Sequence, residues 1–179
     1  EMARFRNGNI GFVFQFHQLL PEFTALENVM IPALIGGEYQ SDAEQEAKRI
    51  LDFLSLSDRL GHKPAQLSGG EKQIIACASV CATAPDVIIL DEPSSNLDVR
   101  HIAILAGIIR KWKDQGKTVI ISEHRLYYLS GLFDRVLYLK DGEIDGDYTA
   151  EEFCGLSAKQ RDDMGSVSYT HLTLPTNSL

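Results

Sequence analysis

Val87-Ile88-Ile89-Leu90-Asp91-Glu92 is the stretch that decides the fold. Its first four residues are apolar without alternation, which is typical of a strand in a parallel sheet covered on both faces. Two acids then follow at the carboxyl end of the strand, where α/β proteins bind ligands. Because successive strand residues point to opposite sides, Asp91 can reach a magnesium ion while Glu92 reaches a water. By itself the pattern also fits an apolar strand that ends in a polar turn.

The residues after Glu92 complete a βαβ unit. A helix is expected to place one apolar face toward the sheet and to end before Gly116. The apolar positions on that face are Ile102, Leu105, Ile109 and Trp112. Thr118 to Ser122 reads as a second buried strand. Strand, helix and strand in this order predict a parallel sheet with a right-handed crossover.

Upstream of Val87 the pattern is mainly helical. Ile10 to Phe14 predicts a short strand that ends at Gln15. Thr24-Ala-Leu-Glu27 and Ser41-Asp-Ala-Glu44 both fit the capping box of a helix start. An apolar stripe at helical spacing follows the second box, with a supporting pair between Glu44 and Lys48. The stripe is made of Ala43, Ala47, Ile50, Leu51 and Leu54.

Two further elements complete the expected fold. A helix should follow Gly69-Gly70 and run through Ile75 and Ala78 to about Ala82. Near the C-terminus, Asp141-Gly142 between two apolar runs is a strong signal for a β-hairpin. At 179 residues the chain is long enough for one α/β domain and hardly for two.

Composition narrows the possible partners. With 44% apolar and 23% charged residues, the chain has the make-up of a soluble globular protein. Its net charge is −8, and residues 134–165 carry nine acidic against four basic side chains, so we expect no nucleic-acid partner. No apolar run approaches the roughly 18 residues that span a bilayer, and no leader directs the chain out of the cytoplasm. Cys77, Cys81 and Cys154 lack zinc spacing and are interpreted as free thiols.

Polar residues stand at the ends of three predicted strands. They are Gln15, the Asp91-Glu92 pair and His124, and Asp98 lies six residues beyond Glu92. Ser68-Gly69-Gly70 precedes a helix, where free amides and the positive helix end attract anions. An ordinary helix cap would explain this turn alone. Polar residues at three strand ends together with an anion site at a helix start are unlikely to coincide by accident.

The order of these motifs resembles the ATP-binding-cassette (ABC) ATPase family over roughly Asn9 to Gly155. Leu67 to Gln73 resembles the signature loop of that family, and Val87 to Glu92 its Walker B strand. Gln15 is similar to the glutamine of the glutamine loop, Ser95-Asn-Leu-Asp98 to the D-loop, and His124 to the switch histidine. Five motifs in the family order make this resemblance specific.

The resemblance implies a role for each residue. Asp91 would hold magnesium, Glu92 would polarise the attacking water, and Gln15 would sense magnesium and the γ-phosphate. His124 would contact that phosphate, and Asp98 would couple two sites across a dimer. The partner subunit's phosphate would be bound by the signature residues, which are Ser68, Gly69, Gly70 and Gln73.

The resemblance also implies ATP and Mg²⁺ as ligands, a homo- or heterodimer of ATPase subunits, and an integral membrane transporter subunit as partner. The protein would lie in the cytoplasm, peripheral on the inner face of the cell membrane. We expect a partial ABC ATPase domain over residues 1–165, with a helical subdomain at about 16–84 and the catalytic core at 85–155. Residues 166–179 are Ser/Thr-rich and look like a foreign tail.

One departure from the family concerns activity. No G-x-x-x-x-G-K-[ST] segment, the P-loop that holds the ATP phosphates, occurs in the sequence. In this family the P-loop precedes the glutamine loop, so we expect the chain to begin after it and to be inactive alone. Two alternatives remain: a non-catalytic half that lends its signature loop to a partner, or an artefactual fragment.

A second departure concerns identity. Asn9 to Asn28 looks like the lipoprotein-release and macrolide-export ATPases, whereas the residues from Ile75 onward look more like energy-coupling-factor ATPases. Ile74 stands where family members usually carry arginine. A join of two genes near Leu67 to Gln73 would explain this change, and a single divergent protein would explain it as well.

Overall fold

The computed structural model describes residues 9–15 and 18–164, which divide into two units. The first unit ends at Glu123 and the second begins at His124. Each unit is described by itself. The predicted foreign tail at 166–179 lies outside the described residues.

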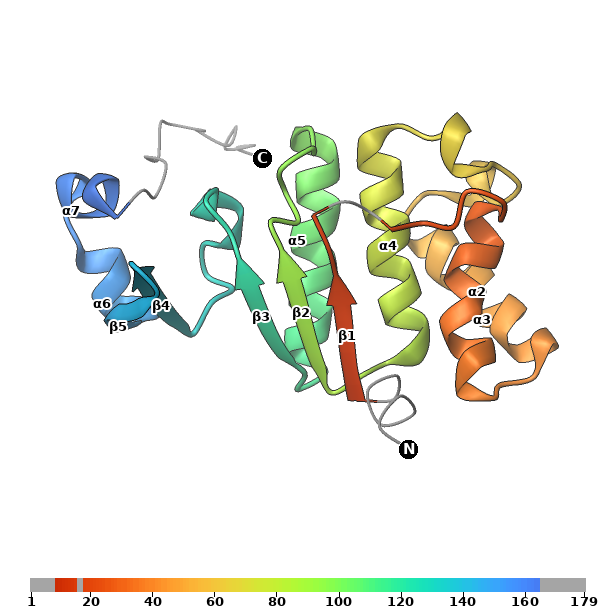
Figure 1. Cartoon of the computed structure of the whole chain (residues 1–179), viewed down its shortest axis with the longest axis horizontal. Coiled ribbons are helices and arrows are strands. Elements are labelled where there is room, and N and C mark those ends of the chain that lie inside the picture. The colour runs from red at the N-terminus through yellow and green to blue at the C-terminus, as the bar shows by residue number, and fades with distance from the viewer. Residues whose placement is uncertain (1–8, 16–17, 165–179) are drawn as a thin grey trace, which may run out of the picture. The chain divides into compact units, whose positions relative to one another are not determined.

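A three-stranded parallel sheet is the centre of the first unit (Figure 1). Its strands are β1 (Ile10–Val13), β2 (Val87–Asp91) and β3 (Thr118–Ser122), in the order β1-β2-β3. The register pairs Val13 with Leu90 and Asp91 with Ser122, so the three carboxyl ends meet at one edge. The predicted βαβ unit and parallel sheet are confirmed.

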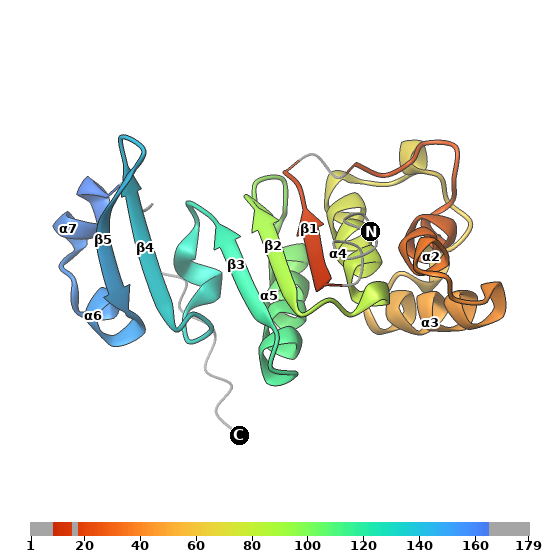
Figure 2. The same cartoon turned by 60° about the horizontal axis from the view of Figure 1, so that its bottom comes forward.

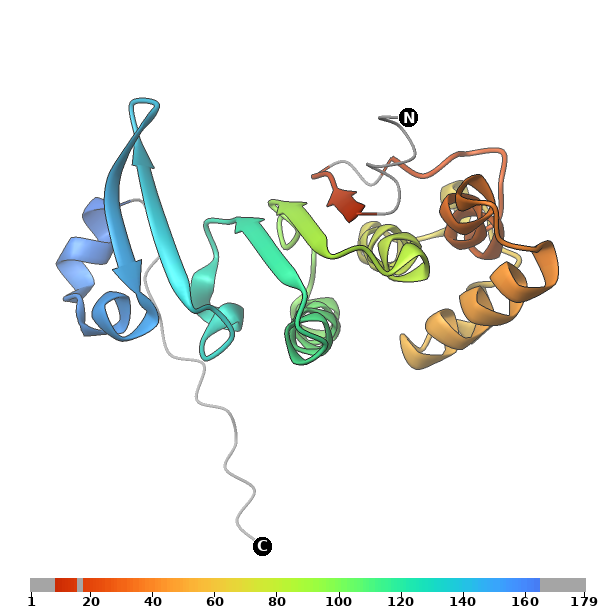
Figure 3. The same cartoon turned by 90° about the horizontal axis from the view of Figure 1, so that it is seen from below.

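Two helices cover one face of this sheet, α4 (Gly69–Thr83) and α5 (Val99–Asp114) (Figure 3). They bury the apolar side of β2, where Ile88 and Leu90 have no exposed surface. Gly11 permits the close approach of β1 to α4, because a Cβ at this position would collide with the side chain of Val80 in that helix. All four predicted core positions of α5 are buried as expected.

The opposite face of the sheet is uncovered in the described residues. Phe12 is 42% exposed and Ile120 is 53% exposed. The prediction that β2 and β3 are buried on both faces is therefore wrong for this unit. The physical reason is that the described helices pack on one side only, and β3 is the last strand of its sheet.

The helical part of the first unit contains α2 (Ala25–Gly36), α3 (Gln40–Phe53) and the 3-10 turns Ser57–Arg59 and Pro64–Gln66 (Figure 2). Helix α2 packs against both α3 and α4. The expected stripe on α3 is buried, and Lys48 Nζ lies 2.6 Å from Glu44 Oε1. Helix α4 contacts both α2 and β1, so the helical part and the sheet form one unit.

The two predicted capping boxes have different outcomes. The box at Thr24 is present in full. The Thr24 side chain accepts a hydrogen bond from the Glu27 amide, and the Glu27 side chain accepts one from the Thr24 amide. The box at Ser41 is wrong, because α3 begins at Gln40 and its N-cap residue is Tyr39, which makes no side-chain capping bond. The amides of Asp42 and Ala43 bond to the Tyr39 carbonyl, so Ser41 lies inside the first turn, and its hydroxyl donates to Asp42 Oδ1 at 3.1 Å.

The second unit is built on the hairpin of β4 (Arg135–Lys140) and β5 (Glu143–Thr149). Asp141 and Gly142 form its loop with φ angles of 50° and 85°, as the sequence predicts. The turn Leu126–Leu129 and helices α6 (Ala150–Gly155) and α7 (Ala158–Asp163) complete the unit. Phe153 is buried, with the Phe133 ring edge-on at 5.8 Å. Among the described residues, no helix is both long and apolar enough to cross a membrane.

Candidate functional site

Gln15 and Glu92 meet at the carboxyl edge of the parallel sheet. Gln15 Nε2 donates a hydrogen bond of 2.8 Å to Glu92 Oε2, although 77 positions separate the two residues. Gln15 lies just beyond β1, and Glu92 directly follows β2. Since these strands are parallel neighbours, their ends bring the two side chains together.

Glu92 leaves the strand in an unusual backbone conformation. Its φ angle is +42°, in the left-handed region, which costs an L-residue about 1–2 kcal/mol. The amide of Glu92 donates to the Ser122 carbonyl at 2.9 Å, and its own carbonyl accepts from the Ser95 amide at 3.1 Å. These bonds hold the chain through the bend. Such strained residues are common at functional sites, where the surrounding structure fixes them.

Asp91 is the last residue of β2 and is half-buried opposite Ser122. The carboxylates of Asp91 and Glu92 and the amide oxygen of Gln15 are hard oxygen donors, which Mg²⁺ prefers. Among the described residues, no group of three or more His, Cys, Asp or Glu side chains could hold a metal ion. Oxygen donors of this kind would fit a magnesium ion that takes its remaining ligands from phosphate and water.

Ser68 caps the first turn of α4. Its Oγ accepts from the Glu71 amide at 3.2 Å, while Glu71 Oε2 accepts from the Ser68 amide at 2.8 Å. A hydroxyl that accepts one bond still has its own hydrogen to donate. Ser68 and Gly69 are exposed and Gly70 is buried, so this helix start presents a hydroxyl and free amide groups at the surface.

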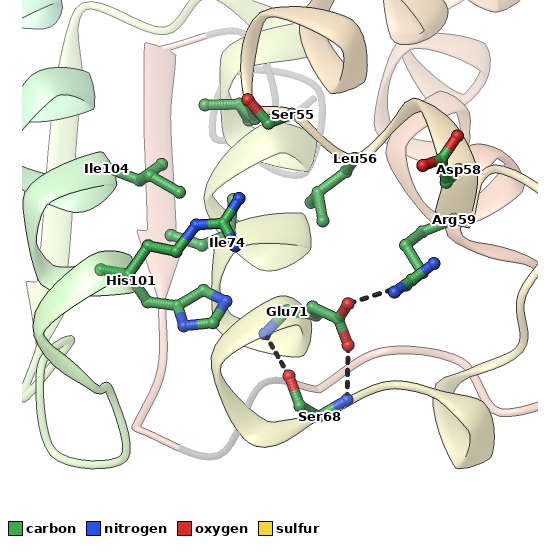
Figure 4. Close-up of a pocket in the computed structure, with 11 residues that line it drawn as sticks. Ser55, Leu56, Asp58, Arg59, Ser68, Glu71, Ile74, His101 and Ile104 are labelled. Carbon is green, nitrogen blue, oxygen red and sulfur yellow. Dashed lines mark hydrogen bonds and ion pairs between the residues drawn. The ribbon is translucent and has the colours of Figure 1, made fainter.

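Arg59, the last residue of the 3-10 turn Ser57–Arg59, makes a hydrogen bond to this first turn of α4. Its Nε donates to Glu71 Oε1 at 2.8 Å (Figure 4). The amide of Ser68 and the guanidinium of Arg59 hold the pKa of the Glu71 carboxyl below its ordinary value. No sequence pattern indicates this role of Arg59, because its partner lies 12 residues away across a loop without periodicity.

Asp98 caps the next helix, α5. Its Oδ1 accepts from the His101 amide at 2.9 Å and lies 2.8 Å from the imidazole Nδ1. The amide and then the ring of His101 hold the pKa of the Asp98 carboxyl below its ordinary value. The Asp98 side chain is 67% exposed, and Asn96 in the same loop is exposed too. Two side chains of the loop between β2 and α5, Asn96 and Asp98, are therefore exposed to solvent.

Gln73 and His124, the two remaining predicted site residues, differ in burial and in the unit to which they belong. Gln73 is only 2% exposed, on the buried side of α4. His124 is exposed and belongs to the second unit. The structure thus joins Gln15 to Glu92 at the sheet edge and places Ser68, Gly69 and Gly70 at the start of α4.

Asn28 is a buried residue that organises the loop before α2. Its side chain accepts from the Leu20 amide at 2.8 Å and donates to the Thr24 carbonyl at 2.9 Å. The side chain is 6% exposed. Its position four residues after a capping threonine is the only sequence signal that could have indicated this role.

A parallel sheet with paired acids at its carboxyl edge, a capped glycine turn and an inserted helical part define the class of ATP-binding-cassette proteins. The chain belongs to the ABC transporter family, whose sequence model matches residues 1–95. The predicted α/β fold and the family resemblance are confirmed.

Curated relatives include the lipoprotein-releasing system ATP-binding protein LolD of Porphyromonas gingivalis. It is 50% identical over 143 residues, which are 79% of this chain and 65% of the relative. The LolD protein of Bacteroides thetaiotaomicron is 49% identical over 148 residues, or 82% of this chain and 67% of the relative. The chain thus spans about two thirds of the length of these relatives. The second resemblance, to energy-coupling-factor ATPases, stays a prediction.

Among solved structures, the ATP-binding cassette MJ0796 superimposes with a TM-score of 0.77 at 32% identity. The match covers 83% of this chain and 66% of that chain. That structure is a dimeric post-hydrolysis state bound to ADP and Pi. A second dimeric structure of MJ0796, a bacterial ABC transporter cassette, matches equally well.

Proposed function

We propose that this chain is part of the ATP-binding and ATP-hydrolysing subunit of an ABC transporter, with Glu92 as the residue that orients the attacking water. The observation that carries the proposal is the 2.8 Å bond between Gln15 Nε2 and Glu92 Oε2. It holds the carboxylate at the strand edge where α/β proteins bind ligands. An ionised carboxylate has about four acceptor sites, so the bond from Gln15 leaves capacity for a water.

The residues around Glu92 would divide the work of phosphoryl transfer. Asp91 and the amide oxygen of Gln15 would hold magnesium, and bound magnesium neutralises charge on the phosphate oxygens. Glu92 would accept the proton of the water or orient it. His124 would contact the γ-phosphate. Gln15 would then transmit the presence of magnesium and the γ-phosphate to the helical part, because the chain continues from Gln15 toward α2.

The signature turn would act on a second subunit. Ser68 would donate its hydroxyl hydrogen to the γ-phosphate of the partner's ATP, next to the amides of Gly69 and Gly70. The buried Gln73 would support this turn from within α4. Asp98 would face the partner subunit and couple the two composite sites. The dimeric state of the similar cassette MJ0796 supports this arrangement.

The transport partner would be an integral membrane subunit, and the chain would lie at the inner face of the cell membrane. The relatives named for lipoprotein release favour lipoproteins as the transported substrate. The alternative is a non-catalytic half that only lends Ser68-Gly69-Gly70 to a partner. The contact between Gln15 and Glu92 favours the catalytic role, because a purely structural half has no need of this bonded acid.

The 179 residues as written contain no P-loop sequence. We therefore propose that the chain alone does not turn over ATP, because oriented amides and a lysine supply most of the phosphate affinity. Turnover of ATP by the rigorously purified chain, dependent on magnesium, would contradict this.

The composite arrangement is tested in tandem-linked dimers that carry a P-loop segment upstream of Glu1 in both halves. Placing Ser68→Arg and Glu92→Gln in the same half damages both sites if the signature acts in trans, so turnover should be near zero. Placing the two changes in opposite halves damages only one site, and about half of the normal turnover should remain. The reverse ranking of these two dimers would overturn the composite site.

A further inference from the structure

The imidazole of His101 occupies the space beside Gly70 where a side chain would otherwise stand. A Cβ built on Gly70 would lie 2.6 Å from His101 Nδ1 and 2.7 Å from Cγ. Real Cβ atoms do not approach other atoms so closely. Only glycine therefore allows the ring to lie against the first turn of α4, and Figure 4 shows it turned toward that helix.

The same ring is bonded to the D-loop carboxylate. His101 Nδ1 lies 2.8 Å from Asp98 Oδ1, and the His101 amide donates to that oxygen at 2.9 Å. The His101 side chain is only 18% exposed, whereas that of Asp98 is 67% exposed. One half-buried ring thus contacts the signature turn and also holds an exposed acid.

A second contact joins the same two segments. A Cβ on Gly69 would lie 3.9 Å from the Asn96 carbonyl oxygen, at ordinary van der Waals distance. The start of α4 is therefore bordered at two points, by Asn96 from the loop that follows Glu92 and by His101 from the first turn of α5.

Charged groups from three elements surround the ring. A pocket of about 310 Å³ is lined by His101 and Arg100 from α5, Glu71 from α4, and Arg59 and Asp58 from the 3-10 turn (Figure 4). Arg59 is bonded to Glu71, and His101 to Asp98. One member of the second pair, His101, and both members of the first line this pocket.

We propose that His101 is a positioning residue that fixes the Asp98 carboxylate relative to the Ser68-Gly69-Gly70 turn, so that the D-loop and the signature turn of one subunit move as one piece. The inference rests on the proposed function, which assigns both elements to the dimer interface. His101 would act through the two residues that it contacts, Asp98 and Gly70.

The contact itself is tested by thermal unfolding of the 179-residue chain. Gly70→Ala should lower the melting temperature, because the new methyl group collides with the ring. Adding His101→Ala should raise it again, because the obstacle is gone. A double variant that melts lower than Gly70→Ala alone would overturn the contact. If these variants do not fold, the kinetic experiment below decides the matter in full.

The functional role is tested by kinetics in a version that carries the P-loop upstream. His101→Phe fills the space without a donor to Asp98, and it should lower kcat at least about tenfold with KM for ATP nearly unchanged. His101→Asn places an amide donor where Nδ1 stands and should restore kcat to within about twofold. Arg100→Ala, from the adjacent position in the same pocket, is the matched control and should resemble the wild type.

The outcomes separate this inference from the proposed function. If Glu92→Gln abolishes turnover while His101→Phe leaves kcat unchanged, the proposed function stands and the positioning role fails. If Asn and Phe at position 101 reduce kcat equally, a hydrogen bond to Asp98 is not what matters, and the inference also fails. If Glu92→Gln leaves turnover intact, the proposed function itself is wrong.

Discussion

Gln15 and Glu92 form a hydrogen bond of 2.8 Å between the ends of two parallel strands. The donor is the Gln15 amide and the acceptor is the Glu92 carboxylate. The residue that we propose to sense phosphate and the residue that we propose to orient water are therefore in direct contact. This contact gives the helical part, which follows Gln15 in the chain, a direct route to the proposed reaction centre.

Gln15→Glu should place two carboxylates in contact and destabilise the first unit. The loss in unfolding free energy at neutral pH should be about 1 kcal/mol more than for Gln15→Ala, because like charges repel. Urea unfolding of both variants at neutral pH measures it. Equal stability at neutral pH would mean that the side chains do not meet.

Glu71 makes stability depend on pH. Its pKa is lowered from 4.5 by the Ser68 amide and by Arg59. A carboxyl with a depressed folded-state pKa contributes stability above its unfolded pKa and loses it as the pH falls through the folded value. Glu71→Gln should therefore be less stable than the wild type at neutral pH, and the difference should vanish as the pH falls through the lowered folded-state pKa. A gap that persists in acid would contradict the assignment.

Thr24 and Ser41 should respond differently to alanine. Thr24 caps α2, so Thr24→Ala should lower the unfolding free energy by about 1 kcal/mol. Ser41 caps nothing, and Ser41→Ala should stay within about 0.5 kcal/mol of the wild type. Denaturant titration of the two variants is a matched comparison. A similar loss of unfolding free energy in both variants would indicate that Ser41 caps a helix after all.

Cys81 should resist alkylation in the folded protein. Burial is the main cause that raises its pKa from 9.0 to about 11, which lowers the thiolate fraction at pH 8 by about a hundredfold. Cys154 is exposed and should react first. Peptide mapping after iodoacetamide treatment, with a denatured sample as control, measures this order. Rapid labelling of Cys81 in the native sample would place it outside the core.

Much of the fold could be predicted from local patterns. The apolar run before Asp91, the stripe on α3 and the Asp141-Gly142 turn each carry a periodicity or a turn preference that acts within a few residues. The second capping box failed for a local reason as well, because a helix can begin a residue before the first good cap. Tyr39 supplied the carbonyl that starts α3, and no side-chain pattern indicates that.

The candidate site could be predicted only in part. The strand-end acids were found because polar residues after an apolar run are visible in the sequence. The roles of Arg59 and His101 depend on contacts across 12 and 31 positions, and no spacing rule indicates them. The exposed face of the sheet also escaped prediction, since an apolar strand looks the same whether one face or both are covered.

The most direct measurement of the central claim is the ATP turnover of Glu92→Gln in a version that carries the P-loop upstream, alongside Gln15→Ala and the wild type. Glutamine keeps the shape of Glu92 and its contact distance but cannot take a proton. The account predicts that Glu92→Gln binds ATP normally, loses at least about 10²-fold in kcat and accumulates as an ATP-bound dimer. Turnover within about twofold of the wild type, with ATP bound equally well, would contradict it.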